Sequence, residues 1–341
     1  MTIYKFIEFK DDFDSDQLPY FFLKSYANHI ESFYGSTYEV AVDHEHNAMP
    51  LTLRKGRFLT SGQIQYPPVN LFSANKLPEE KEGIFITEFL KKIKKEKICD
   101  WLVQPSVTTL FQYVPDNASS CDFGSFQLLL HEFSSKEEIF KAFHPKHRNV
   151  IRNAENKKVC VRFGKECLGD FYALYDKTMR RSGLSISPLS HFESLFNNLS
   201  SSNILCGVCY YNDIPQGGAF IIYTRYGGYY LEGGSADEVL VTGANNLLHW
   251  NIIQILFEKN VRMYDFVGAR LSDVSGTKLE GIQKFKERFG ATLIKGHLWK
   301  MNIHASKTGI VNFFFYIKNK LKQEKPKSDI IDQERNKMIK I

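Results

Sequence analysis

The chain has 341 residues, a length that is too great for one ordinary hydrophobic core and comfortable for two. Its hydrophobic share of 43% and charged share of 24% exclude a largely disordered chain, and its net charge of +6 allows an anionic ligand but argues against extensive RNA contacts. No apolar run reaches the ~18 residues of a transmembrane helix and the first residues do not resemble a signal peptide, so we expect a cytoplasmic protein.

The first 135 residues alternate between strand-like and helix-like patterns. Residues 2–9 alternate in polarity, as a strand does, whereas residues 17–34 carry apolar side chains at helical spacing. Residues 78–97 begin with acidic and end with basic side chains, an order that suits the dipole of a helix. The patterns predict helices at 17–34 and 78–97, and strands at 2–9, 38–42, 48–54, 99–104 and 123–130.

A domain boundary is expected near residues 131–136. Ser134 and Glu137 have the spacing of a capping box, and Pro145 suits the first turn of a helix over 147–158. Beyond it the patterns predict strands at 159–163, 203–211, 215–224, 228–235, 262–267 and 291–301, and helices at 168–182, 188–199, 243–258 and 278–289. This order is typical of an α/β arrangement in which an antiparallel meander leads into a buried helix.

The last residues, 305–341, form a basic and polar tail in which we expect a helix near 308–323. Aromatic and isoleucine side chains there alternate with lysines. The helix is therefore expected to dock on the second domain or, as the alternative, to lie on a membrane surface. The second alternative would place the protein at the inner face of the membrane.

Neither a disulfide nor a metal site is expected. Cys206 and Cys209 have redox-motif spacing, but they lie in a predicted strand, where residues three apart point to opposite faces. The ten histidines show no metal-ligand spacing.

The segment from Glu232 to Asn245 connects a predicted strand to the start of the buried helix through several glycines. Free N–H groups at a helix start bind anions, so a phosphate or carboxylate could sit beside Thr242 and Asn245. An ordinary strand-to-helix turn is the alternative.

Two charged residues further along the chain lie in apolar surroundings. Asp265 stands in an aromatic strand, where a carboxylate either has a structural partner or has a raised pKa and acts as a base. Lys286 lies beside a buried stripe that includes Phe285, so its ammonium could face a cleft and stabilise an oxyanion. A solvated lysine is the alternative.

Arg148 and Arg152 are four residues apart on the predicted helix 147–158 and therefore share one face. Two guanidinium groups on one face could clamp a phosphate. The alternative is a solvated basic face.

Taken together, several segments resemble the FemABX/BioF2-like branch of the GNAT acyltransferase superfamily over about residues 136–300. Their order and spacing carry the resemblance. The segments are Arg148-Asn-Val-Ile-Arg-Asn-Ala-Glu-Asn-Lys-Lys158, Thr178-Met-Arg-Arg-Ser-Gly183, Gly217-Gly-Ala-Phe220, Tyr229-Tyr-Leu-Glu-Gly-Gly-Ser235, Leu247-Leu-His-Trp250, Tyr264-Asp-Phe-Val-Gly268 and Phe285-Lys-Glu-Arg-Phe-Gly290.

The resemblance implies two tandem GNAT-like domains, each a mixed, largely antiparallel sheet flanked by helices, over residues 1–135 and 136–304, with a C-terminal helix and tail over 305–341. It implies transfer of an acyl or aminoacyl group to an amine on a cell-envelope or glycan precursor, with acyl-CoA or aminoacyl-tRNA as donor substrate and no tightly bound cofactor. In the family the lysine of the Phe-Lys pair lies at the reaction centre, and its match here is Lys286. Val241-Thr-Gly-Ala244 is a reduced form of the acetyl-CoA loop of ordinary GNAT enzymes, so the donor stays open.

The working hypothesis is direct attack of an amine on an activated carbonyl. Lys286 would stabilise the oxyanion, and Asp265 or Glu232 would relay a proton. The expected substrate contacts are Arg148, Arg152, Tyr230, Thr242, Asn245 and Phe285. Two alternatives stay open: a non-catalytic GNAT-fold protein that binds a phosphate-bearing ligand, and an RNA-binding module.

Overall fold

The strands of both halves of the chain are short and mostly antiparallel. Those before residue 131 are β1 (Thr2–Lys5), β2 (Thr37–Val42), β3 (Asn47–Lys55), β4 (Thr60–Ile64), β5 (Val69–Asn70), β6 (Trp101–Leu102) and β7 (Ser119–Leu128). Those after it are β8 (Cys160–Phe163), β9 (Ile204–Tyr211), β10 (Ile214–Tyr223), β11 (Gly228–Ser235), β12 (Tyr264–Asp265), β13 (Ala269–Arg270) and β14 (Thr292–Asn302).

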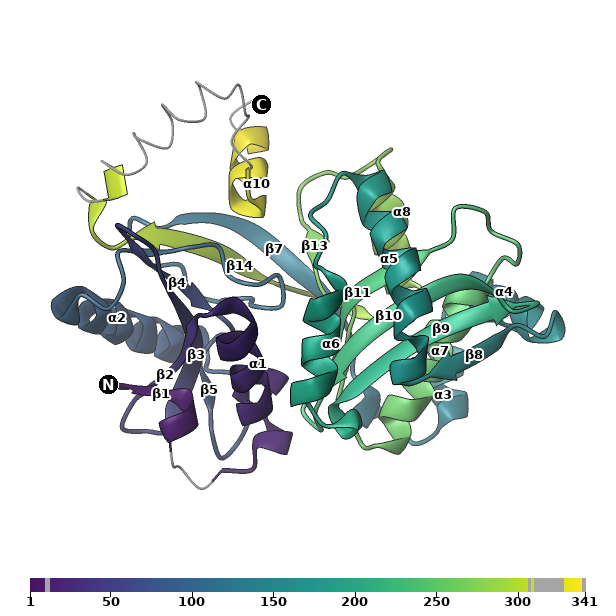
Figure 1. Ribbon diagram of the computed structural model, residues 1–341, viewed down its shortest axis with the longest axis horizontal. Coiled ribbons are helices and arrows are strands. Elements are labelled where there is room, and N and C mark those ends of the chain that lie inside the picture. Colours follow the sequence, from purple (N-terminus) through teal and green to yellow (C-terminus); the bar gives the residue numbers. More distant parts are fainter. Residues whose placement is uncertain (10–12, 306–307, 310–327, 339–341) are drawn as a thin grey trace.

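These strands join into one continuous sheet. The computed structural model describes residues 1–9, 13–305, 308–309 and 328–338, and within them fourteen strands follow the order β1-β2-β3-β4-β6-β14-β7-β12-β11-β10-β9-β8, with β5 beside β3 and β13 beside β7. The predicted mixed α/β class is confirmed. Figure 1 shows two lobes, with the long strands β7 and β14 crossing between them.

Strand β14 connects the lobes. It pairs with β7 along nine residues, from Thr292 opposite Gln127 to Lys300 opposite Ser119, and then with β6 through Met301 and Asn302. The last strand of the second half therefore reaches into the first half, which ties the two lobes together through backbone hydrogen bonds.

Helices cover both faces of the sheet. They are α1 (Lys24–Tyr34), α2 (Glu79–Glu96), α3 (Lys136–Ala142), α4 (Pro145–Asn156), α5 (Leu168–Ser182), α6 (Leu189–Asn198), α7 (Ala244–Glu258), α8 (Lys278–Glu287) and α10 (Ile330–Met338). Helix α5 packs on β10 and β11 from one side, whereas α7 packs on β9 and β10 and contacts α4. The meander and the buried helix agree with the sequence.

Five expectations need correction. The strand expected at 2–9 ends at Lys5, and the strand expected at 99–104 is limited to Trp101 and Leu102. The helix expected at 17–34 begins at Lys24, because Pro19 breaks the pattern and a separate 3₁₀ turn, Tyr20–Phe22, buries the aromatic side chains. The capping box lies one residue later, since Ser135 accepts a hydrogen bond from the N–H of Glu138. The strand expected at 262–267 pairs only at Tyr264 and Asp265.

The Cys206 and Cys209 side chains lie in two different hydrophobic clusters on opposite sides of β9, and both are free thiols. The predicted absence of a disulfide between them therefore follows from the alternation of the strand. Among the described residues, no group of three or more histidine, cysteine, aspartate or glutamate side chains could hold a metal ion.

The C-terminal segment is described in part. The helix expected at 308–323 lies outside the described residues except for Thr308 and Gly309. Helix α10 follows it and packs against β7 and β14. Within the described ranges, no helix combines the length and the apolar character that a bilayer crossing requires.

Candidate functional site

The site begins where two parallel strands separate. β11 and β12 pair only at Gly228 opposite Tyr264 and Tyr229 opposite Asp265. The chain then turns away from β11 through Val267 and Gly268, whose φ angles of 54° and 57° are both in the left-handed region. A left-handed φ is costly for a β-branched residue such as Val267, so this turn is held by its surroundings.

A cleft of about 630 Å³ lies along the part of β11 beyond this separation. We call it the main cleft. Its walls come from β11, the start of α7, the length of α8 and the end of α5. Five of the predicted residues border it or supply its floor: Tyr230, Glu232, Asn245, Phe285 and Lys286.

Lys286 is only 8% exposed, although it is charged. Its ammonium donates hydrogen bonds to the carbonyl oxygens of Val267 and Gly268, the latter at 2.7 Å. Burial lowers the pKa of Lys286 to about 8, and the negative charge of Asp265 opposes that shift. The ammonium therefore lies at the wall of the cleft, fixed by the turn that separates β12 from β11.

Asp265 stabilises the same turn. Its carboxylate accepts hydrogen bonds from the N–H of Val267 at 2.7 Å, from Nε2 of Gln127 at 2.7 Å and from the hydroxyl of Ser125. It is 2% exposed and does not line the main cleft. The sequence leaves two roles open for Asp265, a carboxylate with structural partners or a base with a raised pKa. This geometry favours the carboxylate with structural partners.

Glu232 differs from Asp265 because it lies in the main cleft. Burial raises the pKa of Glu232 to about 7. Among the described residues, no hydrogen bond or neighbouring charge contributes to this shift of the pKa. A partly buried carboxyl group that titrates near neutrality can accept a proton at physiological pH.

The side chains of Tyr230 and Asn245 pack closely against strand backbone at positions where the strand residue is glycine. A Cβ atom at Gly233 would lie 1.8 Å from the hydroxyl oxygen of Tyr230, and one at Gly217 would lie 1.4 Å from Oδ1 of Asn245. The two glycines therefore make room for polar side chains at the cleft.

His249 also lines the main cleft and was not selected from the sequence. Its Nδ1 lies 2.9 Å from the hydroxyl oxygen of Tyr264, and its ring centre lies 4.6 Å from that of Tyr230. Burial lowers its pKa to about 3, so the imidazole is neutral. The sequence signal was a lone histidine in an apolar helix, a pattern that a core position explains equally well.

A second cavity of about 500 Å³ adjoins the main cleft and shares Gly281 and Phe285 with it. We call it the basic cavity. Lys146 of α4, Thr242 before α7 and Arg288 after α8 line it. Gly243 allows α4 to pack directly on the start of α7, because a Cβ there would lie 2.0 Å from the carbonyl oxygen of Val150.

Arg148 and Arg152 line neither cavity. Arg148 donates from Nη1 to the carbonyl oxygen of Lys141 at 2.6 Å, and the Arg152 guanidinium lies over the ring of Phe140 at 5.5 Å. Both side chains point toward α3. The basic residues at the cavity are Lys146 and Arg288, which the spacing argument did not select.

Comparison with known proteins covers most of the residues that line these cavities. Residues 144–286 match the family model described as an acetyltransferase (GNAT) domain. Over these residues the chain is similar to the GNAT acyltransferases. The matched GNAT segment contains α4, the meander, α7 and Lys286. No curated protein sequence matches the chain significantly.

Solved structures agree on the fold. The chain is similar to a crystal structure of FemX, with a TM-score of 0.60 and 14% identity over 81% of this chain and 90% of that chain. At this identity the likeness shows the fold alone, and the expected tandem GNAT-like fold is confirmed.

Two further solved structures are similar with lower TM-scores. The C-terminal domain of a putative lysylphosphatidylglycerol synthetase from Agrobacterium fabrum has a TM-score of 0.49 and 13% identity, over 80% of this chain and 87% of that one. L-PGS from Bacillus licheniformis has a TM-score of 0.48 and 13% identity, over 81% and 87%.

Proposed function

We propose that the protein is an N-acyltransferase that moves an acyl or aminoacyl group from an activated, phosphate-bearing donor to an amine. The observation that carries this proposal is that two groups line the main cleft, the buried Lys286 ammonium and the Glu232 carboxyl, with pKa values of about 8 and about 7. The first can stabilise a developing negative charge and the second can accept a proton, both near neutral pH.

The reaction begins with attack of a neutral amine on the activated carbonyl carbon. Glu232 accepts the proton that the amine nitrogen loses as the new C–N bond forms. The Lys286 ammonium stabilises the oxyanion of the tetrahedral intermediate. The bond to the leaving sulfur or oxygen then breaks, the leaving group takes up a proton, and the product is an amide.

The donor is proposed to enter from the basic cavity. Lys146, Arg288 and the free N–H groups at the start of α7 together form a setting that attracts phosphate. The acyl group would pass Phe285, which borders both cavities, to reach the main cleft. Acyl-CoA and aminoacyl-tRNA both carry phosphates, and this arrangement suits either donor.

The acceptor is proposed to be an amine on a lipid-linked cell-envelope or glycan precursor. Leu184 is 59% exposed and Ile282 is 40% exposed, and both line the main cleft beside Arg181 and Lys278. Exposed apolar side chains next to basic ones suit a carrier with an apolar tail and an anionic headgroup. On this proposal the protein works at the inner face of the membrane.

The test combines donors, acceptors and one variant. Purified protein is incubated with acetyl-CoA, longer acyl-CoA or charged tRNA together with lipid-linked or soluble amine precursors, and products are read by mass spectrometry. We expect an amide product with one donor class and loss of turnover in Lys286→Ala. Tight ligand binding without product from any donor would support the non-catalytic alternative instead.

A further inference from the structure

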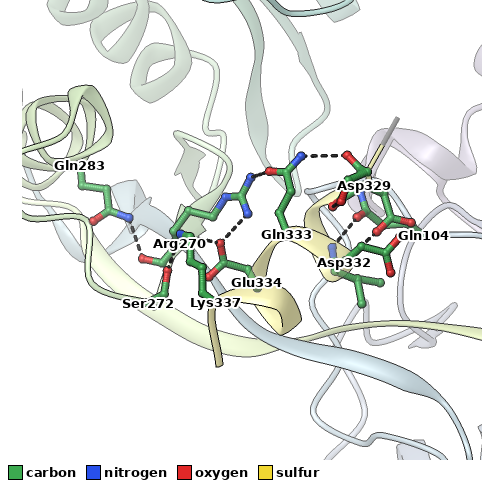
Figure 2. Close-up of polar contacts among 11 residues, drawn as sticks. Gln104, Arg270, Ser272, Gln283, Asp329, Asp332, Gln333, Glu334 and Lys337 are labelled. Carbon is green, nitrogen blue, oxygen red and sulfur yellow. Dashed lines mark hydrogen bonds and ion pairs between the residues drawn. The ribbon is translucent and has the colours of Figure 1, made fainter. Parts of the chain in front are cut away.

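Helix α10 lies at the junction of the two lobes, where the chain from each half passes beneath it (Figures 1 and 2). The N–H of Ile331 donates to Oε1 of Gln104 at 3.1 Å, and the Ile331 side chain is fully buried with Phe123 and Leu298. Helix α10 is therefore held against the sheet by a buried apolar side chain together with hydrogen bonds.

The polar bonds of α10 reach the second half through Arg270. Its guanidinium donates to Oε1 of Glu334 at 2.6 Å and to Oε1 of Gln333 at 2.8 Å. Glu334 is 2% exposed, and the Arg270 side chain is 17% exposed. Because both charges are largely removed from water, losing Glu334 would leave the Arg270 guanidinium with the neutral acceptor Gln333 in place of a charge.

Arg270 lies two residues after Gly268, whose carbonyl oxygen accepts a hydrogen bond from Lys286. The carbonyl oxygen of Arg270 also accepts a hydrogen bond from Nε2 of Gln283 at 2.7 Å, and Gln283 is on α8, three residues before Lys286. Lys337 adds a bond to the hydroxyl of Ser272 at 2.9 Å. Figure 2 shows two of these contacts, Gln283 with Arg270 and Lys337 with Ser272, in the segment between β12 and α8.

We propose that α10 is a latch that fixes the turn holding Lys286, and that Glu334 is a positioning residue that acts on the site through Arg270. The connection consists of hydrogen bonds from Arg270 to Glu334, from Gln283 to the Arg270 carbonyl oxygen and from Lys286 to the turn at Gly268, with Gln283 and Lys286 joined along α8. The catalytic consequence rests on the proposed function of Lys286, whereas the mechanical consequence does not.

The test uses full-length Glu334→Ala and two readouts that need no substrate. Hydrogen–deuterium exchange follows the peptides that cover 266–286, and competitive labelling with acetic anhydride follows the pH midpoint of the Lys286 amine. We expect exchange in that segment to rise about tenfold or more and the midpoint to move upward toward the ordinary lysine value. Arg335→Ala, an exposed position on the same helix, is the matched control and should leave both readouts unchanged.

Glu334→Gln should give an intermediate result, because the amide keeps an acceptor for Arg270 but loses the charge. If Glu334→Ala does not fold, the double variant Arg270→Met with Glu334→Leu removes both charges and still breaks the tie. Unchanged exchange over 266–273 together with an unchanged Lys286 midpoint would overturn the latch, whether or not α10 itself loosens.

The proposed catalytic role of Lys286 and the proposed latch can each be contradicted without the other. If the latch holds but Lys286→Ala keeps full turnover, the acyl-transfer role of Lys286 falls and the latch stands. If Lys286→Ala abolishes turnover but Glu334→Ala changes neither readout, the acyl-transfer role of Lys286 stands and the latch falls.

Discussion

Each half of the molecule contains a strand-helix-strand unit whose two strands are parallel. The two units differ in what occupies the space beyond the paired residues of those strands. In the first half β4, α2 and β6 form the unit, with Ser61 opposite Trp101 and Gly62 opposite Leu102. In the second half β11, α7 and β12 form it, also with two residue pairs. The local architecture is the same in both.

The first half fills its space with its own chain. The N–H of Val103 continues to bond Gly62 at 2.9 Å, and Nε2 of Gln63 donates to the carbonyl oxygen of Gln104 at 3.0 Å. The buried hydroxyl of Thr109 then donates to the carbonyl oxygen of Gln65 at 2.7 Å. The segment after β6 thereby occupies the position that a ligand would take.

In the second half, the corresponding space beyond the paired residues of β11 and β12 is open. After β12 the N–H of Phe266 bonds Phe126 on β7 at 2.9 Å, and the N–H of Val267 bonds Asp265, so the chain turns away from β11. The main cleft lies in the gap. We infer that the first-half unit is a scaffold and that the second-half unit forms the site. The predictions below test that division.

The largest effect is expected from Lys286→Ala. Removing one fixed donor to an oxyanion typically lowers kcat by about 10²–10³. Steady-state kinetics with the active donor measures it, and circular dichroism checks that the fold is kept. Lys284→Ala on the same helix is the control, because the Lys284 ammonium is exposed and pairs only with Glu280 in the described structure. Equal kcat values for the two variants would contradict the prediction.

Glu232→Gln is expected to lower kcat by about 10² and to change the pH profile. Glu232 must be deprotonated to accept a proton, so the wild-type rate should rise with pH up to about 7. Lys286 must be protonated, so the rate should fall above about 8. The variant should lose the acidic limb and keep the alkaline one, and a profile that keeps both limbs would remove Glu232 from the proton relay.

A smaller effect is expected at the basic cavity. Arg288→Ala should raise the KM for a phosphate-bearing donor about tenfold, since a charge-assisted hydrogen bond is worth about 1.5–3 kcal/mol. Arg152→Ala is the matched comparison, because the Arg152 side chain stacks on Phe140 outside both cavities. A larger rise for Arg152→Ala than for Arg288→Ala would restore the sequence-based phosphate clamp.

The sequence predicted the scaffold better than the site. Periodicity located α5 and the meander closely, because strand alternation and helical stripes are local properties. The role of Asp265 depended on Ser125 and Gln127, which lie about 140 residues earlier on another strand. Pairwise spacing put Arg148 and Arg152 on one face, but it could not say that this face turns toward α3 rather than toward α7.

The smallest effect on turnover, and the most direct test of the division, is expected from Glu82→Gln in the first-half unit. Glu82 is 1% exposed, and its carboxylate accepts hydrogen bonds from the N–H groups of Gln112 at 2.9 Å and Tyr113 at 3.0 Å. Burial raises its pKa to about 7, against the opposing effect of those two N–H groups. Like Glu232, it is an acid whose pKa burial raises to about 7, but its Oε1 already accepts two hydrogen bonds from the chain.

The consequence should therefore appear in stability and not in kcat. A carboxyl group whose folded-state pKa is raised stabilises the fold fully below its unfolded-state pKa, and it loses that contribution as pH rises through about 7. Between pH 5 and pH 8 the free energy of unfolding of the wild type should thus fall more than that of Glu82→Gln, by up to about 3 kcal/mol. Urea unfolding at the two pH values measures the difference, and kcat should stay within about twofold of wild type, because no part of the proposed reaction passes through Glu82. A loss of turnover like that of Glu232→Gln would mean that the filled unit also takes part in the chemistry.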